Sequence, residues 1–300
     1  METIELLKKV RAIEIKTRRI SRNQFAGEYH SHFKGKGMMF SEVREYQYGD
    51  EIRNIDWKVT ARYNHPYVKV FEEERELTVM LVVDVSGSRV FGSRQKFKRD
   101  QITEIAAVLA FSAITNNDKV GMIMFSDKVE KYIPPKKGKT HILRIIRDLL
   151  EFEPSGTTTS LTPALRHLTN TIKKRSIAFL LTDFMDTEPG TATLRFEEAL
   201  KIANRKHELI AVRIYDPRER EIPSMGLVKM KDSESGKEYW IDTSNTQVIT
   251  AYRKWWSNFD YALHTLFSRH GMNVAEIATT DDYIKPLIQL FKRKPSYSQT

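Results

Sequence analysis

Cysteine is absent from the 300-residue sequence, which excludes disulfide bonds, thiolate metal sites and thiol catalysis. Long apolar runs are absent too: the longest, Ile105–Phe111, is far shorter than the ~20 residues that a helix needs to span a bilayer. The N-terminal stretch METIELLKKV lacks the apolar core of a signal peptide. We therefore expect a cytoplasmic protein that has no membrane span.

Acidic residues are too few to balance the basic ones, and the formal net charge is +10. Such an excess favours an acidic partner, which is nucleic acid, lipid headgroups or an acidic protein face. The basic residues gather near both ends of the chain, within Lys8–Arg22 and Lys292–Lys294, and no basic stretch is interleaved with aromatic residues for stacking on bases. We expect docking to a protein and no specific binding of nucleic acid.

From Thr78 onward, strand-like and helix-like segments alternate along the sequence. The alternation predicts an α/β fold in which a mostly parallel sheet lies between two layers of helices. Pro134 and Pro135 are expected to end the third strand, a short strand at the sheet edge. The predicted strands are 78–84, 120–125, 128–133, 176–183, 208–216 and 272–277, and the predicted helices are 95–116, 141–152, 161–174, 194–205, 246–270 and 281–292.

Two regions fall outside this alternation. Residues 1–77 show little periodicity, and we expect them to form an N-terminal extension packed on the main domain, residues 78–300. Within the main domain, Leu227–Lys231 and Glu238–Asp242 are typical of two short strands joined by a polar turn. The sequence therefore predicts a β-hairpin inserted near 226–243.

Oxygen-bearing side chains follow the predicted strands, and they include neither imidazole nor sulfur. In an open α/β sheet, ligands bind at the carboxyl ends of the strands. Carboxylates and hydroxyls suit a hard cation, so we expect Mg²⁺ or another divalent cation such as Mn²⁺ or Ca²⁺. The residues concerned are Asp84, Ser86 and Ser88 in MLVVDVSGSRVFG, the loop Ser155–Leu161, and Thr182 with Asp183.

This pattern resembles the metal-ion-dependent adhesion site (MIDAS) of von Willebrand factor A-like domains, which combines D-x-S-x-S, a threonine in G-x-T-x-L-x-x-A-L and a strand-final aspartate. The resemblance implies a Rossmann-like three-layer sandwich. It implies that Ser86, Ser88 and Thr159 contact the metal directly, and that Asp84 and Asp183 do so directly or through water. It also implies an open coordination position for a carboxylate of a partner protein. Phe184 departs from the pattern, since many members have glycine after this aspartate.

A second resemblance covers nearly the whole chain. The segment FSEVREYQYGDEIRNIDWKVTARYNHPYVKVFEEERE, Phe40–Glu76, is similar to the signature of the DUF58 family, a domain of unknown function. The later stretches YDPRERE, LVKMKDSESGKEYWID and ATTDD with LFKRK fit the same family. The resemblance implies a bacterial protein whose partner is a MoxR-type AAA-plus ATPase, acting in protein assembly, maturation or stress response.

The segment Phe40–Glu76 has two interpretations: it clasps the α/β domain, or it forms a face that a partner recognises. Arg53, Asp56 and Trp57 are the predicted partner-binding residues of this segment, and Arg89 beside the second serine is a further candidate that would grip an incoming carboxylate. Polar side chains around Trp57 are suited to a bidentate network, namely Arg44, Asp50, Arg53, Asp56 and Arg62.

Three alternatives were weighed against a non-enzymatic interaction module. A phosphatase-like hydrolase would use Asp84 as nucleophile, but the second aspartate expected two positions later is Ser86. A phosphate-binding loop at Gly138 lacks the glycine required five positions earlier, where Ile133 stands. A structural module would use the metal, or the empty site, only to hold three loops together. We predict that the protein is not an enzyme.

Overall fold

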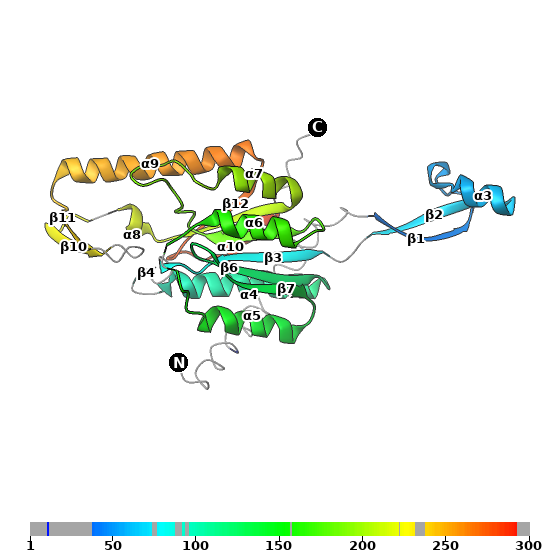
Figure 1. Cartoon of the computed structure of the whole chain (residues 1–300), viewed down its shortest axis with the longest axis horizontal. Coiled ribbons are helices and arrows are strands. Elements are labelled where there is room, and N and C mark those ends of the chain that lie inside the picture. The colour runs from blue at the N-terminus through cyan, green and yellow to red at the C-terminus, as the bar shows by residue number, and fades with distance from the viewer. Residues whose placement is uncertain are drawn as a thin grey trace. The chain divides into compact units, whose positions relative to one another are not determined.

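The computed structural model describes residue 11 and residues 38–73, 77–87, 92–93, 96–156, 158–221, 223–231 and 238–292. The chain divides into two compact units. The hairpin unit is Phe33–Leu77, and the α/β unit combines Met1–His32 with Thr78–Thr300 (Figure 1). The packing of residues 1–77 against the main domain stays a prediction.

The hairpin unit contains regular structure that the sequence pattern did not reveal. Two antiparallel strands, β1 (Met38–Glu45) and β2 (Tyr67–Glu73), enclose the short 3₁₀ helix η2 (Ile52–Asn54) and helix α3 (Trp57–Tyr63). Asn64 ends α3 in the left-handed conformation that often terminates helices. Among the side chains described, burial does not alternate along the strands, since Val43 and Arg44 are both half-buried, as are Lys69 and Val70.

The α/β unit is built on a six-stranded sheet in the order β12-β9-β8-β3-β6-β7. All neighbouring strands are parallel except β7, which runs antiparallel to β6. This mostly parallel sheet confirms the predicted α/β fold class. The strands are β3 (Thr78–Asp84), β6 (Lys119–Phe125), β7 (Val129–Lys136), β8 (Ile177–Thr182), β9 (Glu208–Tyr215) and β12 (Asn273–Ala278).

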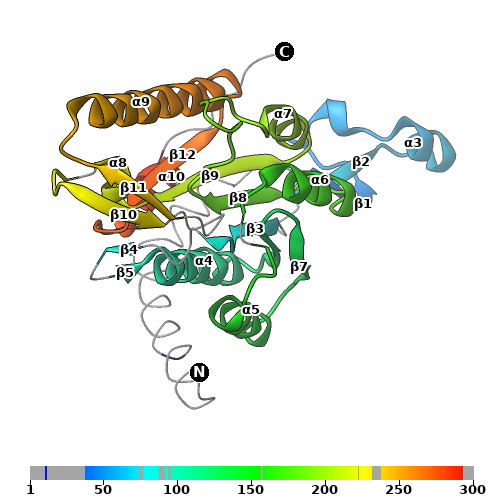
Figure 2. The ribbon, with the colours of Figure 1, turned by 60° about the vertical axis from the view of Figure 1, so that its left-hand side comes forward.

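Helices cover both faces of the sheet, giving the expected three layers (Figure 2). On one face of the sheet, α6, α7 and α9 pack on side chains such as Val82 and Leu180. The opposite face is covered by α4, α5 and α10, and Phe291 of α10 contacts Phe179 there. The helices are α4 (Lys98–Thr115), α5 (Lys139–Glu151), α6 (Leu161–Thr171), α7 (Glu197–Lys206), α9 (Thr246–Arg269) and α10 (Ile284–Lys292).

The burial of the central strands on both faces of the sheet explains why their sequences are continuously apolar. Every residue of β8 is buried, as are six of the seven in β3 and in β6. A strand covered by helices on both faces needs apolar side chains at successive positions and not only at alternate ones.

The edge strand β7 corrects one prediction. It continues through Pro134 and Pro135 to Lys136, because proline is tolerated where no further strand requires its missing N–H. The pairing with β6 is irregular here, around Gly121. A Cβ at Gly121 would lie 2.9 Å from the nitrogen of Pro135, so only glycine permits this close approach.

Three smaller elements complete the described part of the unit. The inserted hairpin is confirmed, since β10 (Leu227–Lys231) pairs antiparallel with β11 (Glu238–Asp242). A capping box at Asp216 begins the short helix α8 (Pro217–Arg220). The two-residue strands β4 (Gly92–Ser93) and β5 (Lys96–Phe97) precede α4.

Helix ends differ from the predictions by up to three residues; for example, the helices expected from 95 and 281 begin at Lys98 and Ile284. The helix expected at Leu194 begins at Glu197, because Leu194 makes an isolated antiparallel bridge to Thr187. The helix expected to reach Lys174 ends at Thr171. Among the described helices, none is both long and apolar enough to cross a membrane.

Buried His207, between α7 and β9, gives the fold a predicted pH dependence. Burial, with the nearby Lys206 and Arg175, lowers its pKa to about 4, and its Nδ1 lies 3.0 Å from the hydroxyl of Ser176. Between pH 6.5 and 4 the unfolded chain therefore binds a proton that the folded chain does not. We expect this residue to remove about 3 kcal/mol of stability as the pH falls through that window.

The measurement is urea unfolding of the wild type and of His207→Gln at pH 7 and pH 4. The stability difference between the two proteins should shift by about 3 kcal/mol in favour of the variant on acidification. A difference that does not change with pH would contradict the prediction.

Candidate metal centre

The candidate site lies where the order of the sheet changes direction. The chain proceeds outward from β3 to β6 and β7, then returns to β8 and proceeds outward to β9 and β12. The neighbouring strands β3 and β8 therefore form the switch point at which open α/β sheets bind ligands. Asp84 ends β3, Thr182 ends β8, and Asp183 follows directly.

Four predicted ligands come together at this edge. The backbone N–H of Ser86 donates to Asp84 Oδ1 at 2.9 Å, and the Thr159 hydroxyl donates to Ser86 Oγ at 2.8 Å. Asp183 is near enough for its negative charge to raise the pKa of Asp84, and all four side chains are buried. The sequence therefore identified distant residues that the fold places together. Predicted ligand Ser88 and predicted partner-binding Arg89 lie outside the described residues.

Thr182, which was among the oxygen-bearing residues at the strand ends but not among the predicted ligands, is a further member of the cluster. Its hydroxyl donates to Asp84 Oδ2 at 2.7 Å and accepts from the backbone N–H of Phe184 at 3.1 Å. Asp84 is thus held through both oxygens. The signal in the sequence was the polar residue at the end of an apolar strand.

A buried lysine completes the cluster. Lys98, at the start of α4, is 2% exposed and donates to Asp183 Oδ2 at 3.1 Å. It also donates to Glu219 of α8. The other oxygen of Asp183 accepts from the backbone N–H of Met185 at 3.1 Å. Neither Lys98 nor Glu219 was predicted from the sequence.

Negative charge exceeds positive charge in this cluster. Asp84, Asp183 and Glu219 supply three carboxylates, and Lys98 supplies one ammonium. Burial, and next the Asp183 carboxylate, raise the pKa of Asp84 to about 6. Burial also raises the pKa of Glu219. For Lys98 burial acts against the charged form, but the two neighbouring carboxylates outweigh it and raise its pKa. A cation bound beside these carboxylates would relieve their repulsion.

The donor set fits a divalent cation. Hydroxyls of Ser86 and Thr159 and carboxylates of Asp84 and Asp183 are oxygen ligands of the kind that Mg²⁺ prefers. Among the described residues, no group of three or more histidine, aspartate or glutamate side chains is arranged to hold a metal by itself. A cation held at this site would therefore need hydroxyl ligands as well as carboxylates.

Glu130 of β7 fixes the loop that carries Thr159. Its carboxylate accepts from the hydroxyl of Ser126 at 2.6 Å, from the backbone N–H and the hydroxyl of Ser155, and from the N–H of Gly156 at 2.9 Å. Burial opposes ionisation, but these hydrogen bonds lower the pKa of Glu130 overall. The loop therefore depends on an ionised carboxylate from outside the ligand set.

Asp186 holds the other side of the same loop. It is fully buried, and its Oδ2 accepts from the backbone N–H of Leu161 at 2.8 Å, at the start of α6. Its Oδ1 accepts from Arg195 at 2.7 Å. The helix start is thus capped by a side chain from the loop after β8, which couples the positions of Thr159 and Asp183.

Glu130→Gln is expected to weaken Mg²⁺ binding by roughly 10–100-fold, the range for side chains that orient metal ligands. The amide keeps one oxygen acceptor, but it cannot accept all the donors that hold the loop. Isothermal titration calorimetry gives the affinity. Glu153→Gln, an exposed position on the same loop, is the matched control and should bind as the wild type does. Equal affinities for the two variants would contradict the prediction.

Phe184 adopts the geometry that glycine adopts more readily. Its φ of 63° lies in the left-handed region, which costs a residue with a side chain roughly 1–2 kcal/mol. Its ring is fully buried and lies 5.1 Å from Phe267 and 6.0 Å from Phe196, between ring centroids. Aromatic packing thus offsets the cost of this conformation in the turn after Asp183.

The hairpin unit contains the other predicted partner-binding residues. Trp57 is 67% exposed and Arg53 is also exposed, whereas Asp56 accepts from the backbone of Lys58 and caps α3. Of the predicted network around Trp57, the bidentate pair between Arg44 and Asp50 forms, with N–O distances of 2.7 and 2.8 Å. Trp57 and Arg53 remain candidates for a recognised face.

Gly138, near the end of the rejected phosphate-loop candidate, lies at the opposite end of the strands from Asp84. It precedes α5 and follows β7, whose last residue, Lys136, pairs with Val120 near the start of β6. Asp84 instead pairs with Phe125 at the end of β6. The loop at Gly138 therefore takes no part in the metal centre.

Comparison with known sequences gives a family match and relatives. A model of the family described as "Protein of unknown function DUF58" matches residues 42–258. Uncharacterized protein Rv1480 of Mycobacterium tuberculosis is 30% identical over 237 residues, covering 78% of this chain and 73% of that protein. Uncharacterized protein YeaD of Bacillus subtilis is 27% identical over 109 residues, covering 36% of this chain and 25% of that protein.

Comparison with solved structures gives more distant similarity. BatB of Bacteroides thetaiotaomicron is 18% identical with a TM-score of 0.46, over 72% of this chain and 97% of that one. Proximal thread matrix protein 1 of the mussel byssus, in a structure with a zinc-occupied MIDAS motif, is 20% identical with a TM-score of 0.36, over 47% of this chain and 38% of that one.

Proposed function

The chain belongs to the DUF58 family, and from this premise we propose that it is a non-enzymatic protein-interaction module that works through a bound divalent cation. Mg²⁺ is the cation proposed, with Mn²⁺ and Ca²⁺ as alternatives of the same ligand preference. When bound, the cation would supply a Lewis-acidic position for a carboxylate of another protein.

The observation that supports this function is the buried cluster of oxygen ligands, with Lys98 beside it, at the switch point of the sheet. Asp84 is held through both oxygens by Ser86 and Thr182, and Lys98 is held between two carboxylates. The partners of these groups fix them in place, as is expected of metal ligands and of the residues that support them. A nucleophile or general base would instead need an oxygen or nitrogen that a substrate can reach, which favours the binding role over the enzymatic one.

The proposed partner is a MoxR-type AAA-plus ATPase, as the family resemblance implies. The chain contributes the hydroxyls of Ser86 and Thr159 and the negative charge that retains the cation, while the partner contributes the carboxylate. Any ATP hydrolysis would belong to the partner. Exposed Trp57 and Arg53 of the hairpin unit are proposed as additional contacts.

The test is a binding assay between the full chain and the MoxR-type ATPase of the same organism, with Mg²⁺ and with EDTA. We expect a complex that EDTA abolishes and that Thr159→Val abolishes, since valine preserves the shape of the buried side chain but removes the hydroxyl. Thr158→Val, at the exposed neighbouring position, is the matched control and should bind normally. A complex that survives both EDTA and Thr159→Val would overturn the metal-dependent proposal.

The hydrolase alternative is tested separately with p-nitrophenyl phosphate. A phosphatase that used Asp84 would release phosphate only with Mg²⁺ and would lose this activity in Asp84→Asn. The interaction module releases none under the same conditions. A module with a purely structural site would gain thermal stability from Mg²⁺, yet its complex with the ATPase would be indifferent to EDTA.

A further inference from the structure

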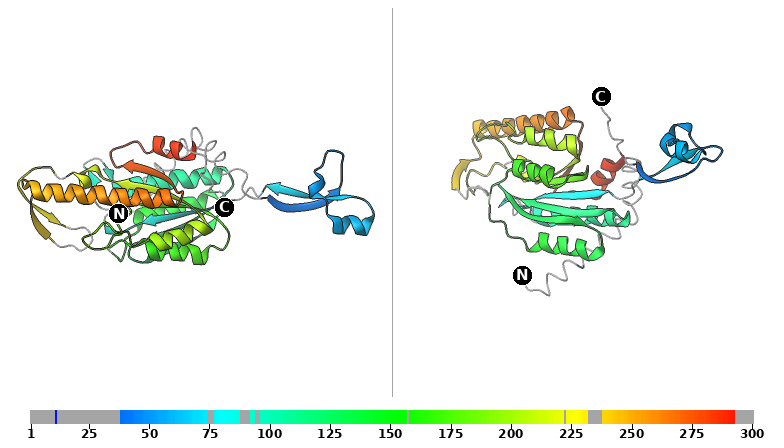
Figure 3. Two further views of the ribbon diagram at one scale, coloured as in Figure 1. Left: turned by 90° about the horizontal axis from the view of Figure 1, so that it is seen from above. Right: turned by 45° about the vertical axis from the view of Figure 1, so that its right-hand side comes forward.

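The two edges of the sheet differ in their capacity to pair with another strand. At one edge, β7 contains Pro134 and Pro135, which lack the N–H donors that pairing requires. At the other edge, β12 has the sequence NVAEIA, without proline or lysine, and its neighbour among the described strands is β9 alone. Figure 3 shows β12 at this side of the sheet, with α10 beside it.

The backbone on the outer side of β12 has no partner within the described residues. Within the described part of the chain, the backbone groups of residues 273–277 are hydrogen-bonded only in the ladder with β9. In a parallel pair, alternate residues direct their N–H and C=O groups to the neighbour, and the others direct theirs outward. The outer edge therefore presents a row of donors and acceptors with the spacing of an extended chain.

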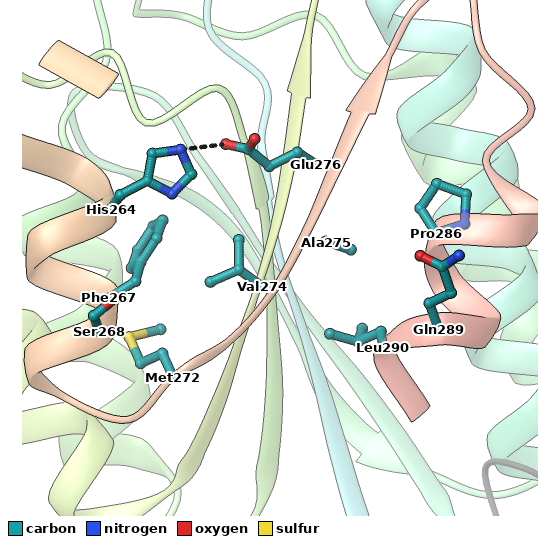
Figure 4. Close-up of a pocket in the computed structure, with 10 residues that line it drawn as sticks. All are labelled: His264, Phe267, Ser268, Met272, Val274, Ala275, Glu276, Pro286, Gln289 and Leu290. Carbon is teal, nitrogen blue, oxygen red and sulfur yellow. Dashed lines mark ion pairs between the residues drawn. The ribbon is translucent and has the colours of Figure 1, made fainter. Parts of the chain in front are cut away.

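This outer edge lies in a groove of about 430 Å³ between α9 and α10 (Figure 4). The volume is in the range of sites that bind ligands. Its lining is mixed: the apolar side chains are Phe267, Met272, Val274, Ala275, Pro286 and Leu290, and the polar ones are His264, Ser268, Glu276 and Gln289.

Charged groups at one end of the groove are paired with each other. Glu276 accepts from Arg213 at 3.0 Å and lies 3.6 Å from His264 Nε2, the contact marked in Figure 4. Arg213 is buried, pairs with Asp260 at 2.7 Å and stacks over the ring of Phe259. The charged groups at this end therefore already have partners within the chain. The features left for a ligand are the outer backbone groups of β12 and the apolar part of the lining.

We propose that the groove receives an extended segment of a partner protein, which adds to β12 as a further strand. The segment is hydrogen-bonded to the backbone of β12, and its alternate side chains contact the α9 wall and the α10 wall. The set of side chains that faces Phe267 and Met272 on the α9 side is apolar, which gives an apolar residue at every second position of the segment. The β12 of a second copy is disfavoured as the occupant, because its own α9 and α10 would accompany it into the groove.

The experiment is selection from a library of random ten-residue peptides displayed on phage, using the full chain and its Ser268→Trp variant in parallel. Ser268 is exposed and lines the groove, so tryptophan fills it without altering the core. Ser257→Trp, exposed on α9 outside the groove, is the matched control. We expect the wild type and the control to enrich peptides with alternating apolar residues, and Ser268→Trp to bind those peptides at least tenfold more weakly.

Two further measurements distinguish strand addition from other binding. Methylation of one alternate set of backbone nitrogens in a selected peptide, the set that faces β12, should abolish binding, and the bound peptide should slow amide hydrogen exchange in residues 273–277. Peptides that tolerate methylation of each alternate set in turn, or that bind Ser268→Trp equally well, would overturn the proposal. A concentration-dependent dimer that Ser268→Trp dissociates would also overturn it, in favour of a second copy as the occupant.

Discussion

Replacing Lys98 by methionine is expected to lower the free energy of unfolding of the metal-free protein by about 3–5 kcal/mol, the usual cost of removing one partner of a buried ion pair. Lys98 is 2% exposed and is the ammonium that offsets Asp183 and Glu219. Methionine has a similar shape and leaves those carboxylates uncompensated. Urea unfolding in the presence of EDTA measures the loss.

The same substitution should tighten Mg²⁺ binding by at least tenfold, because the cation would enter a site with one more uncompensated negative charge. The double variant Lys98→Met/Glu219→Gln should recover part of the stability, since it removes one of the stranded carboxylates. Lys201→Met is the control: this exposed lysine of α7 pairs with Glu198, and its loss should change stability by less than about 1 kcal/mol. Weaker Mg²⁺ binding in Lys98→Met would contradict the assigned charge balance.

Asp84→Asn is expected to act in opposite directions on the metal-free and the metal-bound protein. Burial and Asp183 disfavour the ionised carboxylate, raising its pKa from 3.8 to about 6. This penalty corresponds to about 3 kcal/mol at neutral pH, and we expect the neutral amide to recover about 1–3 kcal/mol of it in EDTA. The amide oxygen can accept from Ser86, and the Thr182 hydroxyl can rotate to accept from the amide nitrogen.

With Mg²⁺ at 100 times its dissociation constant, the wild type should gain about 2.7 kcal/mol and the variant none. Unfolding curves in EDTA and in Mg²⁺ therefore test both directions with one pair of proteins. Asp148→Asn is the control, because this buried carboxylate pairs with Lys131 at 2.8 Å and lies outside the cluster. It should lose stability in both buffers and keep the gain from Mg²⁺. An Mg²⁺ gain retained in Asp84→Asn would remove this residue from the centre.

The sequence predicts the sheet and the ligands for the same physical reason. Strands buried on both faces have continuous apolar sequences, and the polar residue that ends such a run marks the carboxyl edge where ligands bind. Asp84 and Asp183 were recognisable because each ends such a strand, and Thr159 because its loop precedes a helix.

Lys98 and Glu219 were not recognisable, because nothing local distinguishes them from neighbouring charged residues. Lys98 belongs to the basic run Lys96–Arg99, and its partners lie 85 and 121 positions later in the chain. The hairpin unit was missed because a two-stranded structure has no buried face to impose periodicity. The prediction that Pro134 and Pro135 end the third strand was wrong because a strand can contain proline when it lies at a sheet edge. Among the described strands β7 has only β6 as a neighbour, and this position becomes apparent only in the assembled sheet.

The close approach at Gly121 constrains the order in which substitutions can accumulate during evolution. A Cβ at this position would lie 2.9 Å from the carbonyl oxygen of Ile133 and from the nitrogen of Pro135, and 2.7 Å from Met80 Sδ. Two of these are backbone atoms, so no change of rotamer makes room for a larger residue. The path of β7 must therefore change before Gly121 can be replaced. The edge formed by β7, whose two prolines prevent pairing with another strand, is inherited together with this glycine.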